Sequence, residues 1–201
     1  SRFTGLEATD WSWVALIFDY NNDTLKDIFV ANGIYKDLTD HDYVNYYANN
    51  DLFIAKYRAD SSVLTNLIDK IPSTPVHNFL FENSGDLQFE YVANSAGLLL
   101  KGFSNGAVYG DLDNDCDLDL VINNINDAVS VYKNEFSTGN YIQFQLEGAG
   151  NNTAAIGAQI TIYCSGKMYY QEQSPVKGYL SSIDPRVHFG LGNHELIYSV
   201  L

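Results

Sequence analysis

Short apolar runs, separated by polar loops, make up most of this chain. Residues 14–18 and 107–109 are apolar runs that lead into acidic loops, and residues 28–31 and 120–122 are apolar runs that follow those loops. The runs that follow the loops are rich in β-branched residues, and all four runs are too short for helices. Each unit therefore predicts a strand, a loop and a second strand.

The two units are copies of one another. Residues 11–32 align with residues 103–124 without a gap, so each position recurs 92 residues later. Both copies keep an aromatic residue, a serine, an apolar run, an Asp-rich loop and a second apolar run in register. Self-similarity of this kind is typical of repeat architectures. We expect the two copies to share one local structure.

The spacer between the copies has a different pattern. From residue 36 to residue 70, apolar side chains often recur at spacings of three or four, which predicts one or two helices. Two prolines shortly afterwards end this insertion. Residues 77–83 then predict a strand, Ser84-Gly85-Asp86 a turn, and residues 87–92 the returning strand.

The last third of the chain alternates apolar and polar residues. Residues 141–147, 158–163 and 167–173 each predict a strand that is half-buried on one face. Together they predict a separate antiparallel β unit, and a further strand begins near Leu201. The chain as a whole is therefore expected to be mainly β: a partial β-propeller of about two blades with a short helical insertion, followed by a small antiparallel β domain. The expected parts are residues 1–35 (first unit), 36–75 (insertion), 76–138 (second unit) and 139–201 (β domain).

Charge narrows the possible partners. The chain carries 25 acidic and 11 basic residues, a net charge of −14. Such a surface repels phosphate backbones, which argues against nucleic acid as a partner, and it suits divalent cations. No apolar run approaches the ~20 residues of a membrane span, so none is expected. Cys116 and Cys164 lie far apart in sequence, and either a disulfide or two half-buried thiols is compatible with their positions.

The acidic loops have the spacing of an oxygen-ligand loop around a hard cation. In such loops positions one, three and five supply side-chain oxygens, position seven a backbone carbonyl and position nine a further carboxylate. Calcium accepts six to eight oxygen ligands, whereas zinc and copper favour the His and Cys that these positions lack. The candidate ligands are Asp111, Asp113, Asp115, Asp117 and Asp119 in the second loop, and Asp19, Asn21, Asp23, Leu25 and Asp27 in the first.

Electrostatic repulsion favours the second loop as the stronger site. Its five carboxylates lie within nine residues, and a bound divalent ion would offset their mutual repulsion. The alternative, a solvated acidic turn, stays open. Position six, where such loops usually carry Gly, holds Thr24 in one copy and Cys116 in the other. Because the first loop also has the neutral Asn21 and a nearby Lys26, we expect it to bind calcium weakly or not at all.

Two family resemblances follow from these motifs. The repeats resemble FG-GAP/VCBS repeats, the calcium-loop blades of integrin-α-like β-propellers, through Trp11-Ser12-Trp13 and residues 19–27, 78–83 and 106–115. The tail resembles the ASPIC/UnbV domain found beside such repeats in exported bacterial proteins and in cartilage acidic protein. The residues that carry this second likeness are Leu146-Glu147-Gly148, Asn151-Asn152, 155–158, 178–182 and 188–192.

The resemblance implies extracytoplasmic, calcium-stabilised propeller blades followed by a small β domain. It also implies a fragment, because a propeller needs four to eight blades and about two are recognisable, and because the ASPIC/UnbV-like unit stops before its expected end. Exposed blade edges are then expected, which a homo-oligomer could cover.

Two functions are compatible with these features. The first is a non-catalytic, calcium-binding extracytoplasmic module that binds a glycan or protein ligand at the cell surface. The second is a fragment of an exported polysaccharide-active enzyme, since carboxylates on a propeller can perform acid–base chemistry. No catalytic residue is assigned, because the clustered carboxylates all belong to the ion loops. His188, inside an apolar strand, is expected to be a structural histidine.

Overall fold

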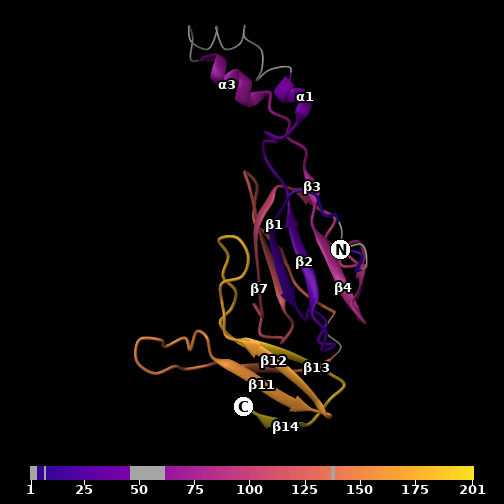
Figure 1. Ribbon diagram of the computed structural model, residues 1–201, viewed down its shortest axis with the longest axis vertical. Helices are drawn as coiled ribbons and strands as arrows, with labels where there is room; N and C mark the ends of the chain where they lie inside the picture. Colours follow the sequence, from indigo (N-terminus) through magenta and orange to yellow (C-terminus); the bar gives the residue numbers. More distant parts are fainter. Residues whose placement is uncertain (1–3, 7, 46–61, 137–138) are drawn as a thin grey trace.

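The computed structural model describes residues 4–6, 8–45, 62–136 and 139–201. Two antiparallel sheets pack against each other in the first two thirds of the chain, and a smaller β domain follows at one end of them (Figure 1). The mainly β fold predicted from the sequence is confirmed. Among the described residues, no helix is long and apolar enough to cross a membrane.

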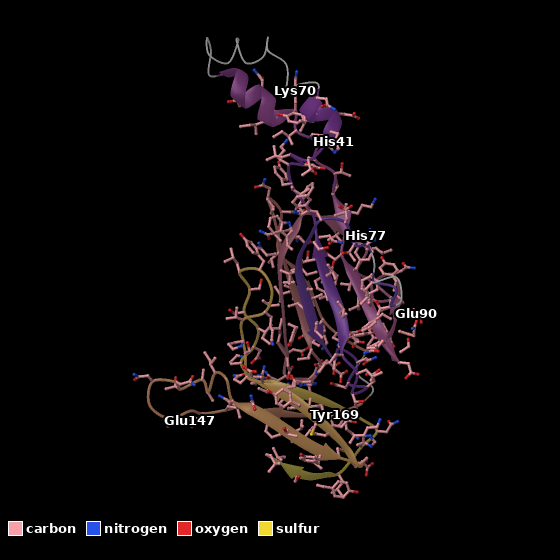
Figure 2. The ribbon with its side chains drawn as sticks, in the orientation of Figure 1. His41, Lys70, His77, Glu90, Glu147 and Tyr169 are labelled. Atoms are coloured by element: carbon pink, nitrogen blue, oxygen red, sulfur yellow. The ribbon has the colours of Figure 1, made fainter. Side chains whose placement is uncertain are left out.

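The first sheet has four strands in the order β1-β2-β4-β5. Every neighbouring pair is antiparallel, and a bulge lies between Ser12 and Val14. Glu90, on the outermost strand, lies at the edge of the molecule (Figure 2). The strands are β1 (Ser12–Phe18), β2 (Asp27–Asn32), β4 (Phe79–Gly85) and β5 (Gln88–Tyr91).

The second sheet repeats the first with the same register. Its order is β7-β8-β9, and its bulge lies between Ser104 and Gly106, 92 residues after the bulge of the first sheet. Leu120 pairs with Tyr132 as Ile28 pairs with Phe81, so β9 occupies the position of β4. The strands are β7 (Ser104–Gly110), β8 (Asp119–Asn124) and β9 (Ser130–Tyr132).

The core lies between the two sheets. On β1 the alternating side chains of Val14, Leu16 and Phe18 are buried, whereas Ile17 is exposed on the opposite face. Phe18 stacks on Tyr109 of β7 with ring centroids 4.5 Å apart. Burial of each large apolar side chain contributes about 1.5–3 kcal/mol, so this cluster is the main stabilising contact of the repeats. Its other buried members are Phe29, Ala31, Leu80, Ala93, Leu98, Ala107, Leu118, Leu120 and Ile122.

The predicted helical insertion contains two described helices, α1 (His41–Tyr43) and α3 (Ser62–Asp69), which extend from the end of the sheets away from the C-terminal domain (Figure 1). Much of the predicted helical pattern falls on residues 46–61, outside the described residues. Asp40 caps α1 by accepting a hydrogen bond from the amide of Tyr43 at 2.7 Å. After α3 the chain returns through β3 (Val76–His77), which pairs with β6 (Lys101–Gly102).

Two details of the predicted hairpin at residues 77–92 are wrong. The first strand breaks at Asn78, whose buried side chain accepts a hydrogen bond from the Asn32 amide (2.9 Å) and donates one to Ser104 Oγ (3.0 Å). The turn is formed by Asp86 and Leu87, with φ of 49° and 60°, and β4 continues to Gly85. A leucine at positive φ is rare, so the sequence pattern favoured the nearby Ser-Gly instead.

The C-terminal domain has its own core. Its strands form a pair, β10-β13, and a three-stranded sheet, β12-β11-β14. Buried Ile160, Ile162, Val187, Phe189 and Leu191 pack between them. The strands are β10 (Asn140–Phe144), β11 (Gln159–Cys164), β12 (Lys167–Glu172), β13 (Val187–Gly192) and β14 (Ile197–Val200).

Candidate metal centre

The two Asp loops connect β1 to β2 and β7 to β8, and their backbones have the same conformation. Position four has a φ of 60° in both copies, at Asn22 and Asn114. Position six has a φ of 84° at Thr24 and 80° at Cys116. The left-handed turn that usually requires glycine is therefore kept in both loops, although neither carries it.

The amide at position seven also repeats. In the first loop the N–H of Leu25 donates to Asp23 Oδ1 at 2.7 Å, and in the second the N–H of Asp117 donates to Asp115 Oδ1 at 3.2 Å. These bonds turn the amide of position seven inward toward the fifth-position carboxylate. The predicted ligands Leu25 and Asp117 thus lie at equivalent places in the two loops.

The ninth-position carboxylates close the loops through backbone hydrogen bonds. Asp27 Oδ2 accepts the N–H of Tyr20 at 3.2 Å, and Asp119 Oδ2 accepts the N–H of Leu112 at 3.0 Å. Both aspartates are buried, with exposures of 0% and 2%. Each thus ties the start of its loop to its end.

Two asparagines complete this arrangement. The N–H of Asn83 donates to Asp27 Oδ1 at 2.9 Å, and the N–H of Asn134 donates to Asp119 Oδ1 at 2.8 Å. Both oxygens of each ninth-position carboxylate therefore accept a backbone N–H. The sequence analysis included Asn83 in the 78–83 motif but gave it no role, and it did not single out Asn134, because both lie outside the aligned copies.

In the first loop the leading carboxylate is engaged by the loop itself. Asp19 Oδ1 accepts the N–H of Asp23 at 3.0 Å, and Asp19 Oδ2 accepts the N–H of Thr24 at 2.9 Å. Asn21 and Asp23 join through a side-chain contact of 3.4 Å. The oxygens that would face a cation thus accept hydrogen bonds from the loop's own groups.

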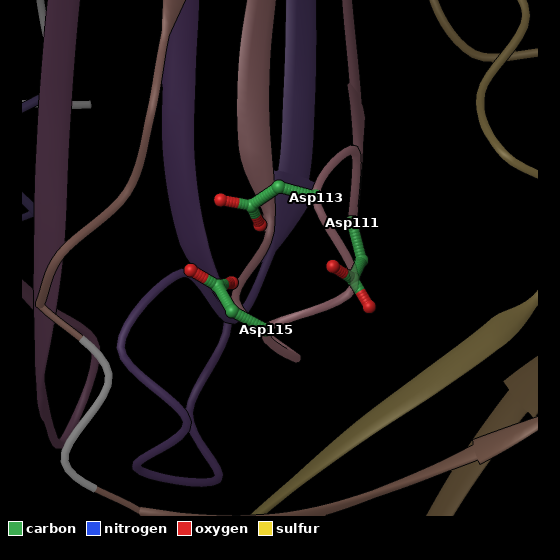
Figure 3. Close-up of side chains that lie close together, drawn as sticks. All are labelled: Asp111, Asp113 and Asp115. Carbon is green, nitrogen blue, oxygen red and sulfur yellow. The ribbon is translucent and has the colours of Figure 1, made fainter.

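In the second loop the leading carboxylates form an open group. Oxygens of Asp111, Asp113 and Asp115 lie within 4.8 Å of one another (Figure 3). Asp111 is 5% exposed, and its Oδ1 accepts no hydrogen bond from any described residue. An unpartnered buried carboxylate oxygen is costly, and a hard cation would satisfy it. This donor set fits calcium or another hard divalent cation.

Lys133, just after β9, contacts the same group. Its Nζ lies 2.5 Å from Asp113 Oδ2 and 2.9 Å from Asp115 Oδ2. The contact lowers the pKa of Asp115 and raises that of Lys133. The side chains of Lys133, Asp113 and Asp115 are 53%, 41% and 35% exposed, so water screens the ion pair, which contributes little to stability, and a divalent cation could compete with it.

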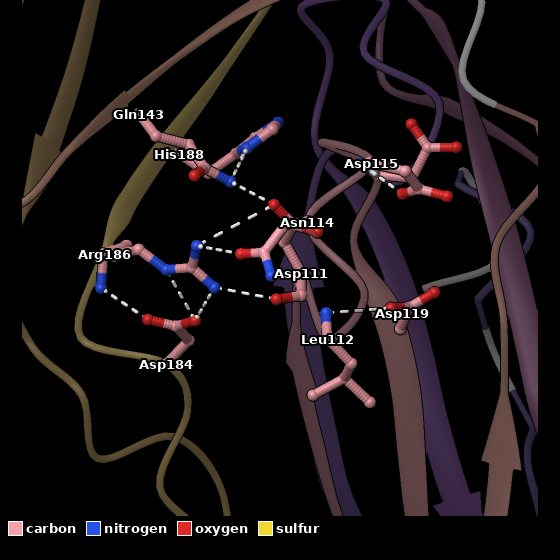
Figure 4. A network of polar contacts seen from close by, with 10 residues as sticks. Asp111, Leu112, Asn114, Asp115, Asp119, Gln143, Asp184, Arg186 and His188 are labelled. Carbon is pink, nitrogen blue, oxygen red and sulfur yellow. Dashed lines mark hydrogen bonds and ion pairs between the residues drawn. The ribbon is translucent and has the colours of Figure 1, made fainter.

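The second loop also contacts the C-terminal domain. Arg186 Nη2 donates to the backbone oxygen of Asp111 at 2.7 Å, and Nη1 lies 3.4 Å from Asn114 Oδ1 (Figure 4). Asp184 fixes this guanidinium through its Oδ2, 2.9 Å from Nε. Gln143 Nε2 lies 3.4 Å from Asp111 Oδ2. The candidate metal loop is therefore part of the junction between the repeats and the C-terminal domain.

The first loop contacts the same domain through Asn22. His188 Nε2 lies 2.6 Å from Asn22 Oδ1, and the N–H of Gly192 donates to the Asn22 carbonyl at 2.8 Å. Gly190 packs so closely that a Cβ there would lie 2.1 Å from Asp19 Oδ2. Burial lowers the pKa of His188 to about 4, so the ring is neutral, donates to Asn22 and accepts from Gln143.

Burial also perturbs two carboxylates of the first loop. It raises the pKa of Asp19 to about 6 and that of Asp27 to about 7. Perturbed carboxylates of this kind often mark acid–base catalysts. Here both side chains are at most 1% exposed, and every carboxylate oxygen accepts a backbone N–H. They are thus enclosed by the fold rather than presented to a substrate.

The two cysteines are free thiols. Cys164 is buried in the C-terminal domain, where its Sγ donates to the Leu196 carbonyl at 3.1 Å. Cys116 is partly exposed at position six of the second loop. Of the two alternatives left open by the sequence, the structure has the unpaired thiols.

Sequence reasoning found the loops but missed the residues that join them to the C-terminal domain. Arg186, Asp184 and Gln143 lie far from the loops in sequence, and no spacing rule connects them. The one available signal was the asparagine shared by position four of both loops. An Asn there adopts the left-handed conformation readily, and its side-chain oxygen contacts His188 in the first loop and Arg186 in the second.

Residues 148–201 match the family model described as ASPIC and UnbV. This confirms the predicted resemblance for that part of the chain, which includes Arg186 and His188. No curated protein sequence matches the chain. The Asp loops lie outside the matched residues, so their likeness to FG-GAP/VCBS repeats stays a prediction.

Proposed function

We propose that this chain is a non-catalytic, calcium-stabilised interaction module that works outside the cytoplasm, with a glycan or protein as its ligand at the cell surface. The calcium site is the loop that begins at Asp111. The observation that carries the proposal is the buried Asp111 Oδ1, which accepts no hydrogen bond from the described residues and belongs to a group of three carboxylates. The FG-GAP/VCBS-like motifs of the repeats support the same assignment.

The side chains of Asp111, Asp113 and Asp115 would hold the ion, with the backbone carbonyl of Asp117 as a further ligand. Calcium would supply positive charge that offsets the repulsion among these carboxylates. The chain's own residues do the rest: Asp119 holds the loop closed, and Arg186 holds the loop against the C-terminal domain. The ion would therefore act as a structural brace at the junction.

The first loop is not assigned a calcium ion in this proposal. Both oxygens of Asp19 accept backbone N–H groups, and Asn21 lacks a charge. One calcium ion per chain is the expected stoichiometry.

Calcium titration after treatment with a chelator tests the proposal. Isothermal calorimetry should show one site, and calcium at 100 times its Kd should stabilise the fold by about 2.7 kcal/mol. Asp113→Asn and Asp115→Asn should each weaken binding by about tenfold or more, because each removes a charged ligand from an exposed position. Glu90→Gln, which removes one exposed charge far from the loop, is the matched control. Absence of both binding heat and a calcium-dependent rise in Tm would reject the proposal.

A further inference from the structure

The second sheet lacks the outer strand that the first sheet has. In the first sheet β4 pairs with β2 on one side and with β5 on the other. In the second sheet β9 occupies the position of β4 and pairs with β8, but among the described residues no strand pairs with its other edge. The outer edge of β4 is therefore filled by β5, whereas the equivalent edge of β9 is open among the described residues.

The register identifies the backbone groups at the open edge. In the first sheet Leu80 pairs with Phe29, and its carbonyl accepts the N–H of Val92 on the β5 side at 2.9 Å. Val131 pairs with Val121 in the equivalent register. The N–H and C=O of Val131 therefore point away from β8, because both groups of a strand residue face the same neighbour.

The side chains at this edge are apolar and accessible. Val131 is 60% exposed, Val129 55% and Phe136 53%. Natural edge strands are commonly protected by lysine or proline. The nearest lysine, Lys133, instead places its ammonium group on Asp113 and Asp115. The edge of β9 thus has the features of a template for a further strand.

We propose that β9 accepts an extended segment of another polypeptide, antiparallel to β9, in the place that β5 fills in the first sheet. This inference names the partner class for the proposed interaction module and rests on that role, but not on calcium. Strand addition supplies affinity through backbone hydrogen bonds and specificity through alternate side chains.

Charge and size define the partner further. In the first sheet Glu82 lies opposite Glu90, whereas the residue equivalent to Glu82 is Lys133. An acidic residue in the incoming strand would therefore lie opposite Lys133, whose side chain is 53% exposed and whose ammonium group it would share with Asp113 and Asp115. A second copy of this chain fits less well, because a three-residue strand offers little of the ~1,200 Å² that stable dimers bury, and each copy carries a charge of −14.

A synthetic peptide with the sequence of residues 86–93, which contains the β5 strand, is the probe. Fluorescence anisotropy with the intact chain should show saturable binding, and a scrambled peptide should not bind. Val131→Pro should weaken binding at least tenfold while leaving the Tm and circular dichroism unchanged, because it removes an N–H that faces away from β8. Val131→Asp is a second edge variant with the same expected loss, because it places a negative charge beside the acidic residues of the peptide. Met168→Ala, at a 62% exposed position on β12 of the C-terminal domain, is the control that should bind normally.

Several outcomes would overturn the inference. One is no binding by the unaltered chain at about 1 mM peptide, and another is equal binding by Val131→Pro. A dimer in sedimentation analysis that Val131→Pro dissociates would assign the edge to a second copy instead. Each peptide titration is run with calcium and with chelator. Peptide binding without calcium binding would reject the calcium site alone, and loss of peptide binding under both conditions would reject the role of β9.

Discussion

Several described residues other than glycine have a positive φ, and three of them, in the turns of the repeats, carry side chains that disfavour it. Thr24, Cys116 and Leu87 all have φ between 60° and 84°. Each costs about 1–2 kcal/mol relative to the right-handed region, because Cβ approaches the following carbonyl oxygen. The loops keep this conformation at position six because the surrounding hydrogen bonds of Asp23 and Asp115 fix the amide that follows.

Leu87→Gly should stabilise the protein. Leu87 is 66% exposed, so the substitution removes strain at φ 60° without losing buried surface. Relief of strain exceeds the entropy cost of glycine, and the net gain is expected to be roughly 0.5–1 kcal/mol. Urea unfolding measures it, with Leu87→Ala as the control that keeps Cβ and should change little. A loss of stability in the glycine variant would show that the turn is not strained.

The two Asp loops are one structural element with two charge arrangements. Their strands, bulges, positive-φ positions and ninth-position hydrogen bonds repeat, and they differ in the leading carboxylate. Asp19 accepts two backbone N–H groups from its own loop, whereas Asp111 Oδ1 accepts none from the described residues. Position nine therefore closes the loop in both copies, whereas positions one, three and five of the second loop carry the proposed cation ligands.

Substitutions in the second loop should separate these two roles. Without calcium, Asp119→Ala should destabilise the fold by roughly 2–4 kcal/mol, because two buried backbone N–H groups lose their acceptor. Asp113→Ala should change stability by less than about 1 kcal/mol, because Asp113 is exposed. In calcium titrations, Asp113→Ala should weaken calcium binding more than Asp119→Ala does. Chemical unfolding in chelator and in calcium checks both, and equal losses in chelator would contradict the separation.

At the scale of the whole molecule, both Asp loops are joined to the C-terminal domain. Arg186 reaches the second loop and His188 reaches the first. Asn134 also links the loops, because its Nδ2 donates to the Tyr20 carbonyl at 2.6 Å. A calcium ion in the second loop would therefore stabilise the contact between the two parts as well as the loop.

Acidification should weaken this contact through His188. Its pKa is about 4 in the fold and 6.5 when unfolded, so between those values the unfolded chain binds a proton that the folded chain does not. Stability should therefore fall by up to about 1.4 kcal/mol per pH unit from pH 6.5 to 4, roughly 3 kcal/mol in all, and then level off.

The buried carboxylates of the first loop act in the opposite direction. Their pKa values of about 6 and 7 are raised from 3.8, so the folded chain binds protons first and gains stability as the pH falls. Comparison with His188→Gln isolates the histidine, because the variant keeps both aspartates. Unfolding free energies are measured in chelator from pH 4 to 8. The value for the unaltered chain minus that for His188→Gln should fall as the pH drops below 6.5. A pH-independent difference would contradict the assignment.

The sequence by itself determined the repeat, the mainly β fold, and the spacing of the acidic loops. These follow from local pattern, because apolar alternation and Asp spacing act over a few residues at a time. The turn between β4 and β5 was not predicted correctly, because Leu87 adopts a backbone conformation that leucine disfavours. Residues 46–61, on which much of the helical prediction fell, lie outside the described residues.

The tertiary structure alone decided which carboxylates remain open and what the loops touch. Asp19 and Asp111 both stand at position one of their loops. Only the packing shows that Asp19 accepts backbone N–H groups, whereas Asp111 leaves an oxygen unpartnered among the described residues. Arg186 lies 75 residues from Asp111, and the open edge of β9 is visible only beside the filled edge of β4. Hydrogen bonds and strand pairs between distant residues depend on how the chain folds back on itself, and local pattern does not encode that path.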